Sequence, residues 1–246
     1  LLETLADVHS RLGHFEEAND LQSRALDLRR LLLEGRTATS REQLELATSM
    51  TRLGVIEARS MSFESAEQLL NQGLDTRRSF ADPEGPEVAD SLGSLGRLAL
   101  QRGDNQAAYE LFSQSVELRR KLEDPPSEEM IAILGNSGSM LVKLGRYEEA
   151  RAPLTEALDL VRYHYPENRR LVFGIQNSLV PVERTTGDHD SVVSLARSNL
   201  EVVEQMYDGV HPWVLTAVSV LASELARAGE DDEALAYAER AYEGYR

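Results

Sequence analysis

The stretches "LGHFEEANDLQSRAL" (residues 12–26) and "LGRYEEARAPLTEAL" (residues 144–158) write the same short phrase twice. Both contain Leu-Gly, an aromatic residue two positions after the glycine, Glu-Glu-Ala and a closing Ala-Leu. Repetition of a phrase at a distance indicates a fold built from a repeated unit, and such a signal takes precedence over other patterns. The phrase therefore decides the fold before any candidate for chemistry is considered.

The alanine of Glu-Glu-Ala marks six units along the whole chain, and we use it as the reference column. Its occurrences are separated by 48, 42, 42, 42 and 42 residues. Large and small apolar residues flank the column at spacings of three, four and seven, which is the spacing of one helix face. Each unit is therefore predicted to be two helices. The reference residues are Ala18, Ala66, Ala108, Ala150, Val192 and Ala234.

A glycine five positions before the reference column predicts where the first helix of each unit ends. Glycine adopts the left-handed conformation of a helix C-cap at low cost. Met61 takes its place in the second unit, and we expect that turn to close differently. Proline-containing segments separate the units, because proline ends one helix and can begin the next. These segments are "ADPEGPE" (81–87), "EDPPSEE" (123–129), "YPEN" (165–168) and "DGVHP" (208–212).

This pattern resembles the tetratricopeptide repeat (TPR), over the whole chain. The 42-residue period, the "LRR" that closes second helices at 28–30 and 118–120, and "YDGVHPWV" at 207–214 are similar to the longer variant of kinesin light chains. Many bacterial signalling proteins carry similar repeats, and we expect a bacterial protein. The resemblance implies an all-α, right-handed superhelix (an α-solenoid) with a concave groove that binds peptides or partner proteins. It predicts a single array over 1–246, with repeats at about 1–40, 43–84, 87–126, 129–168, 171–210 and 212–246.

The fifth unit departs most from the pattern. Val192 and Asn199 stand in columns of small residues, and Pro181 lies inside the first helix, where it removes a backbone hydrogen bond and is expected to kink the helix. The first linker is also six residues longer, in "LLLEGRTATSREQ". These departures predict local changes within the same overall fold.

One stripe of each first helix should line the groove, at fifteen, fourteen, eleven, eight and seven residues before the reference column. These thirty positions hold seven basic and two acidic residues, whereas the other 216 hold 19 basic and 40 acidic residues. The predicted groove thus has the opposite sign from the rest of a chain whose net charge is −16. Arginine can hold a carboxylate through two parallel hydrogen bonds, so we expect an acidic peptide or partner protein. The predicted peptide-binding residues are Arg52, Arg59, Arg97, Asn136, Lys143 and Asn177.

A structural interpretation competes for the basic residues that end first helices, since a cation there also stabilises the helix dipole and the last carbonyl groups. Arg11, Arg59, Lys143 and Arg227 are open to that interpretation. Arg52 and Arg97 lie in mid-helix, where the ligand and the inter-repeat interpretations remain equally open. Trp213, the only tryptophan, is either a binding anchor or, with more weight, a packing residue between units.

Other chemistry finds little support. The chain has no cysteine, and none of its five histidines forms an i, i+4 pair, so no metal site or other cofactor is predicted. No phosphate-binding loop or nucleophile elbow occurs. The Glu-Glu pairs open second helices, where acidic residues suit the helix dipole. The arginine pairs close second helices and recur with the repeat, which disfavours a nucleic-acid patch.

We therefore expect a non-catalytic scaffold. It would be cytoplasmic and would bind neither nucleic acid nor membrane. The competing hypothesis is a regulatory segment of a larger signalling enzyme, such as a bacterial Ser/Thr kinase, or of a transcription regulator. The chain starts at Leu1, so we take it as an excised fragment. Its Ala-rich last helix has no polar capping helix after it, so we expect its apolar side to be covered either by missing chain or, through self-association of the array ends, by a second copy.

Overall fold

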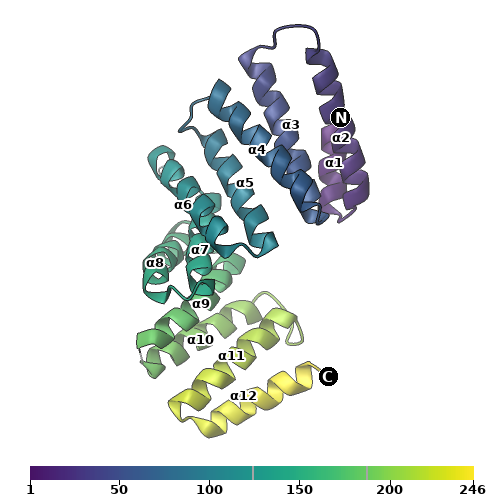
Figure 1. Cartoon of the computed structure of the whole chain (residues 1–246). Coiled ribbons are helices and arrows are strands. Elements are labelled where there is room, and N and C mark those ends of the chain that lie inside the picture. Colours follow the sequence, from purple (N-terminus) through teal and green to yellow (C-terminus); the bar gives the residue numbers. More distant parts are fainter. Residues whose placement is uncertain (124, 187) are drawn as a thin grey trace. The chain divides into compact units, whose positions relative to one another are not determined.

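The structure, a computed structural model, describes residues 1–123, 125–186 and 188–246, and every regular element in these ranges is a helix (Figure 1). The helices pair in chain order into six antiparallel hairpins, as the six residues of the reference column predict. The hairpins are α1 (Leu2–Arg11) with α2 (Phe15–Leu33), α3 (Ser40–Arg59) with α4 (Phe63–Phe80), α5 (Pro86–Arg102) with α6 (Asn105–Leu122), α7 (Glu128–Lys143) with α8 (Tyr147–His164), α9 (Arg169–Glu183) with α10 (His189–Glu204), and α11 (Pro212–Ala228) with α12 (Asp231–Gly244).

The turn inside a hairpin is built in the same way with and without glycine. Gly13, Gly103, Gly145 and Gly229 have φ values between 74° and 85°, the left-handed region. Met61 has φ 64° and also lies there. Its N–H donates to the carbonyl of Ala58 at 3.1 Å, and the next N–H donates to the carbonyl of Glu57 at 2.9 Å, the same two bonds that the glycine turns make. The expectation of a different closure at Met61 is therefore wrong: the helix-end hydrogen bonds outweigh the strain of a side chain at positive φ.

The longer first linker ends in a capping box at the start of α3. The Thr39 hydroxyl accepts from the Glu42 N–H at 3.3 Å, and the Glu42 carboxylate accepts from the Thr39 N–H at 2.9 Å. Arg36 holds the same carboxylate through two hydrogen bonds of 3.0 and 2.6 Å. The Arg36 bonds, followed by those from Thr39, lower the pKa of Glu42 to about 2. The extra residues of this linker thus fix the start of the second hairpin.

Pro181 does not end α9. The helix runs through it to Glu183 and passes directly into a 3₁₀ turn over Arg184–Thr186. Proline in a helix leaves one carbonyl without its donor, and the change to 3₁₀ geometry follows within one turn.

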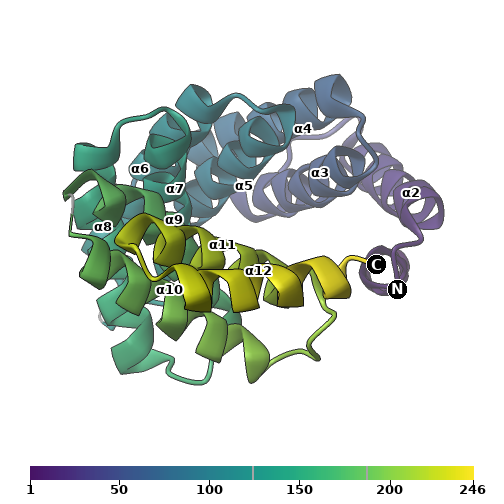
Figure 2. The same ribbon diagram turned by 90° about the horizontal axis from the view of Figure 1, so that it is seen from below.

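The chain forms two compact units, Leu1–Pro125 with α1–α6 and Pro126–Arg246 with α7–α12. Within a unit, each second helix packs against the first helix of the next hairpin: α2 on α3, α4 on α5, α8 on α9 and α10 on α11 (Figure 1 and Figure 2). The first helices also contact one another, α3 with α5 and α7 with α9. The single array over 1–246 stays a prediction.

Glycines twelve positions before the reference column let the two helices of a hairpin approach closely. An added Cβ would lie 2.6 Å from the Phe112 ring at Gly96 and 2.6 Å from Leu154 Cγ at Gly138. Phe112 and Leu154 are fully buried. The predicted groove stripe lies on the side of each first helix next to this contact, and we call that side the inner face of a unit.

Candidate functional site

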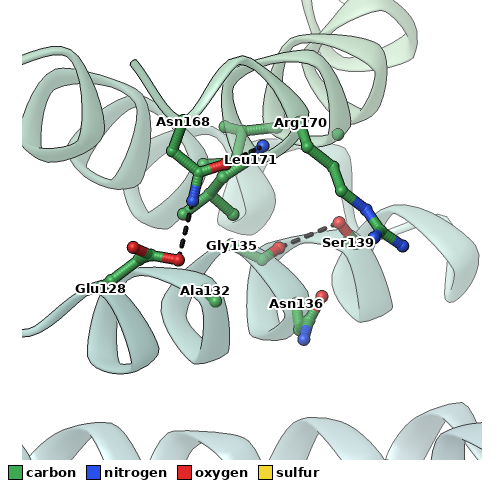
Figure 3. A pocket seen from close by; sticks show the side chains of 10 residues that line it. Glu128, Ala132, Gly135, Asn136, Ser139, Asn168, Arg170 and Leu171 are labelled. Carbon is green, nitrogen blue, oxygen red and sulfur yellow. Dashed lines mark hydrogen bonds between the residues drawn. The ribbon is translucent and has the colours of Figure 1, made fainter. Parts of the chain in front are cut away.

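The inner face of the second unit carries a cavity of about 310 Å³ between α7 and α9 (Figure 3). We call it the α7–α9 cavity. Three of its lining residues belong to the predicted groove stripe: Gly135, Asn136 and Ser139. The full lining is Glu128, Ala132, Gly135, Asn136, Ser139, Asn168, Arg170, Leu171, Gly174 and Ile175.

Small residues shape this cavity. A Cβ at Gly174 would meet no atom within 4 Å, so the backbone there borders open space. Ser139 and Ser178 join the two helices through a hydroxyl–hydroxyl hydrogen bond of 2.7 Å. Asn136 is half-buried, and its amide makes no hydrogen bond within the described ranges. An amide that both donates and accepts, beside glycine backbone, suits the peptide groups of an extended ligand.

Arg170 supplies the positive charge of the cavity. Its guanidinium carbon lies 5.3 Å from the centre of the Trp213 ring, a cation–π contact. In the described part of the chain, no carboxylate lies within salt-bridge distance of Arg170, although many other arginines are paired. Figure 3 shows its side chain reaching from α9 toward α7. The arrangement leaves the guanidinium hydrogen-bond donors available to a ligand.

Trp213 is a packing residue that also holds Arg170. Its ring stacks on Phe173 at 5.5 Å and 16°, and Tyr207 meets it edge-on at 5.4 Å. Phe173 belongs to the buried core of α9–α12, and Trp213 packs against that core. Of the two interpretations from the sequence, the structure supports packing. The contacts with Phe173 and Tyr207 hold the ring in place, and the Arg170 guanidinium lies against it.

The opposite end of the α7–α9 cavity is negative. The Glu128 carboxylate accepts a hydrogen bond of 2.8 Å from the Asn168 amide, and the Asn168 side-chain oxygen accepts from the Leu171 N–H at 3.0 Å. That second bond caps the start of α9 and therefore fixes the amide that holds Glu128. The cavity thus has a carboxylate at one end and a guanidinium at the other (Figure 3).

A second cavity, of about 520 Å³, lies on the inner face of the first unit between α1 and α3. The predicted residues Arg52 and Arg59 line it, but both already have partners within the fold. Arg52 lies 3.3 Å from the Glu3 carboxylate, and Arg59 donates to the Ser10 hydroxyl at 2.9 Å.

Glu3 is the centre of that network. It also accepts from Ser49 at 2.6 Å and from Arg29 through two bonds of 3.2 Å. Burial alone would raise the pKa of Glu3, but the hydrogen bonds from Ser49 and Arg29 and the charge of Arg52 outweigh it, so the pKa is lowered. The carboxylate therefore stays ionised and neutralises this cavity from within.

The other predicted residues lie in both units. Arg97 is exposed on α5 and donates to the Ser94 hydroxyl at 3.0 Å. Lys143 is exposed at the end of α7, and Asn177 is half-buried on α9. The structure brings Arg52 and Arg59 to one cavity and Asn136 to another.

Arg170 and Glu128 were missed from the sequence because the predicted stripe began fifteen residues before the reference column. Both residues lie seven positions earlier, two helical turns further along the same face. Extending the stripe by that heptad step would have found them. The sequence analysis did not establish that the first helices extend far enough to place these two residues on the inner face.

Among the described residues, no three His, Asp or Glu side chains converge where they could hold a metal ion. No helix in the described ranges combines the length and apolarity that a membrane span requires.

Comparison with known families assigns the repeats. Residues 45–121 and 87–162 each match the tetratricopeptide repeat, and the starts of the two matches are one 42-residue period apart. Together with the paired helices, this match shows that residues 45–162 of the chain are tetratricopeptide repeats. None of the curated proteins compared matches the chain.

Solved structures share its fold at low sequence identity. BtubC (BKLC) from P. vanneervenii is 18% identical, with a TM-score of 0.76 over 94% of this chain and 91% of that one. A putative kinesin light chain of Podosopora anserina with nearly identical TPR-like repeats is 20% identical, with a TM-score of 0.64 over 83% and 94%. The Rap conjugation gene regulator of plasmid pLS20, solved in complex with the Phr* peptide, is 17% identical, with a TM-score of 0.57 over 98% and 70%.

Proposed function

We propose that the protein is a non-catalytic scaffold that binds a peptide, or an extended segment of a partner protein, on its inner faces. The tetratricopeptide fold supports this proposal, as does the peptide complex of the structurally similar Rap regulator. Cavities on the inner faces of both units, lined by backbone and small polar side chains, suit a peptide main chain better than a compact small molecule.

The α7–α9 cavity is the principal site in this proposal, and its ligand carries Asp or Glu. The observation that carries the proposal is Arg170, a guanidinium held on Trp213 at the rim of a cavity, with no carboxylate of the described residues within salt-bridge distance. A charge-assisted, two-point hydrogen bond is the favourable use of such a group. Asn136 would bind the ligand backbone beside it, and Lys143 and Asn177 would extend the site along α7 and α9.

Arg52, Arg59 and Arg97 take a secondary place. Arg52 faces Glu3, so an acidic ligand there would compete with a carboxylate that the fold already supplies. Arg59 and Arg97 bond to serine hydroxyl groups, which are weaker partners than a carboxylate. These residues would strengthen a long ligand without selecting it.

The test uses Trp213, which is the only tryptophan and lies against Arg170. Acidic, neutral and basic peptide pools of equal length are titrated, with Trp213 fluorescence and the anisotropy of a labelled peptide as readouts. We expect the acidic pool to bind best. Arg170→Gln should weaken that binding about tenfold, the equivalent of roughly 1.4 kcal/mol. Glu128→Gln should strengthen it, because a negative charge leaves the same cavity.

Arg162→Gln is the matched control, since Arg162 is an exposed arginine on α8, outside the inner face. It removes the same charge from the protein and should leave the acidic pool's affinity unchanged. Equal binding of the three pools, or equal losses in Arg170→Gln and Arg162→Gln, would show that net charge and not the α7–α9 cavity governs binding.

A further inference from the structure

Glu128 and Arg170 occupy the same position on two neighbouring first helices, twenty-two residues before the reference column. They put opposite charges on α7 and α9, at the two ends of the α7–α9 cavity (Figure 3). The other first helices that contain this position carry no charge there. Their residues are Leu44 on α3, Pro86 on α5 and Pro212 on α11. The pair of opposite charges is therefore particular to this cavity and is not a general property of the repeat.

The Glu128 carboxylate is fixed in place, yet its charge has no basic partner among the described residues. One of its oxygens accepts a hydrogen bond of 2.8 Å from the amide of Asn168, which is a neutral group. No Lys, Arg or His of the described ranges lies within salt-bridge distance of Glu128. The side chain is exposed, so a ligand can reach its second oxygen. A carboxylate in this state is an acceptor for a cationic group of the ligand.

A structural role accounts for only part of this arrangement. An acidic residue in the first turn stabilises a helix through the helix dipole. Glu129 supplies a second carboxylate in the same turn of α7 and is not part of the cavity lining. The helix also has its own cap, because the Ser127 hydroxyl accepts from the Met130 N–H at 3.1 Å. The start of α7 therefore does not depend on Glu128 alone, and its place in the cavity lining points to a ligand.

The two ends of the cavity are close enough for one short segment of extended chain. The helices α7 and α9 contact each other directly, through the hydrogen bond of 2.7 Å between Ser139 and Ser178. The axes of packed helices lie roughly 8–10 Å apart, and an extended chain advances about 3.3 Å per residue. A ligand that crosses from α7 to α9 therefore covers the distance between them in about three residues.

We propose that the α7–α9 cavity selects a dipolar segment, in which a Lys or Arg lies about three residues from the Asp or Glu that binds Arg170. Glu128 is the specificity-determining residue: it pairs with the cation of the ligand, whereas Arg170 pairs with the carboxylate. The inference rests on the proposed function, because it assigns a second charge to the peptide that binds at the same site. A segment that is acidic throughout would place a carboxylate against Glu128, and the site discriminates against it.

The experiment compares three labelled peptides of equal length by fluorescence anisotropy at one ionic strength. The first contains Lys-x-x-Glu-x-x-Lys in a neutral background, so that a lysine reaches Glu128 in either direction of the chain. The second has the same composition, with both lysines moved to the ends of the peptide. The third has glutamine in place of both lysines. We expect the first to bind about three- to fivefold more tightly than either of the others, as a partly exposed ion pair allows.

The second peptide controls for the general attraction between lysine and a protein of net charge −16. Glu128→Gln gives the decisive result, because its effect should change sign with the ligand. It should weaken binding of the first peptide about three- to fivefold and strengthen binding of the third. Glu129→Gln is the matched control: it removes the same charge from the same turn, outside the cavity lining, and should leave the order of the three peptides unchanged. Circular dichroism checks the helices of both variants.

The outcomes separate this inference from the proposed function. Equal affinities for the three peptides, with binding still weakened by Arg170→Gln, would overturn the dipolar preference and leave the acidic site standing. Equal effects of Glu128→Gln and Glu129→Gln on the first peptide would do the same. Binding that does not respond to Arg170→Gln, or no binding of any peptide, would overturn the proposed function and this inference with it.

Discussion

At the scale of single residues, Asn199 marks a local weakness in the core. It is 1% exposed, and neither polar atom of its side chain has a hydrogen-bond partner within the described residues. The other hairpins place a small residue seven positions after the reference column, where the helices approach. Those residues are Ala25, Gly73, Ser115, Ala157 and Ala241. An amide in that position carries a desolvation cost that the small residues avoid.

We expect Asn199→Ala to stabilise the protein by about 1–2 kcal/mol, because it removes an unsatisfied buried amide and leaves a residue that fits the column. Urea unfolding followed by circular dichroism measures the change. Asn177→Ala, on the inner face of the neighbouring helix, is the control and should stay within about 0.5 kcal/mol. A loss of stability in Asn199→Ala would mean that the asparagine is satisfied in solution.

At the scale of helices, Arg29 on α2 and Arg77 on α4 each join one hairpin to the next in the first unit, through Glu45 of α3 and Ser91 of α5. The first arginine of each pair near the end of α2, α4 and α6 turns inward, in addition to lying at a favourable helix end. Arg77 bonds to Thr51 at 2.9 Å and to Ser91 at 2.6 Å, and burial lowers its pKa despite the opposing charges of Asp90 and Glu87. The second unit places valine at this position on α8 and α10. The two solutions imply that the residue and its partner on the next helix change together.

Replacing the polar Arg77–Ser91 pair by an apolar pair should show that the two positions are energetically coupled. Arg77→Val is expected to cost about 1–3 kcal/mol, since it removes the two hydrogen bonds that the Thr51 and Ser91 hydroxyl groups accept from the guanidinium. The double variant with Ser91→Ile copies the Val161–Ile175 combination and should recover at least about 0.5 kcal/mol relative to the sum of the single changes. Urea unfolding of the full double-mutant cycle measures this coupling. Additive effects would contradict it, and Arg78→Val controls for loss of an exposed arginine.

At the scale of the whole molecule, the two compact units predict that a destabilising substitution lowers stability mainly in the unit that contains it. Stability in repeat proteins is close to a sum of repeat and neighbour contributions. Gly96 and Gly138 allow a crossed test, because they occupy the same column in different units and leave the same space for a Cβ.

Gly96→Ala should lower hydrogen-exchange protection mainly in α1–α6, and Gly138→Ala mainly in α7–α12. Each added Cβ overpacks a buried side chain at a cost of about 1–3 kcal/mol. Native-state hydrogen exchange with mass spectrometry resolves the two regions. Gly174→Ala, whose Cβ meets no atom within 4 Å, should lower protection in neither region. A uniform loss of protection along the chain in both variants would show that the units unfold together.

The sequence predicted the six hairpins because the same residue types recur at every helix contact and every turn. It placed Asn136 on the wall of a cavity for the same reason. It could not predict the closure at Met61, where two hydrogen bonds at the helix end outweigh the strain of a side chain at positive φ. Nor could it predict that Glu3 forms an ion pair with Arg52, or that Arg170 makes a cation–π contact with Trp213. These contacts join residues 40 or more positions apart, and helical periodicity carries no information about such pairs.

The predicted groove stripe and the rest of the chain differ in the sign of their charge, and this difference has a kinetic consequence. A ligand rich in carboxylates first meets the long-range repulsion of a protein with net charge −16 and feels the attraction of Arg170 only nearby. At an ionic strength of 0.1 M the repulsion is screened beyond about 10 Å, whereas a contact at the cavity rim is screened much less. Encounter with such a ligand would therefore speed up with added salt, and a partner with one short acidic segment would be captured more readily than one acidic throughout.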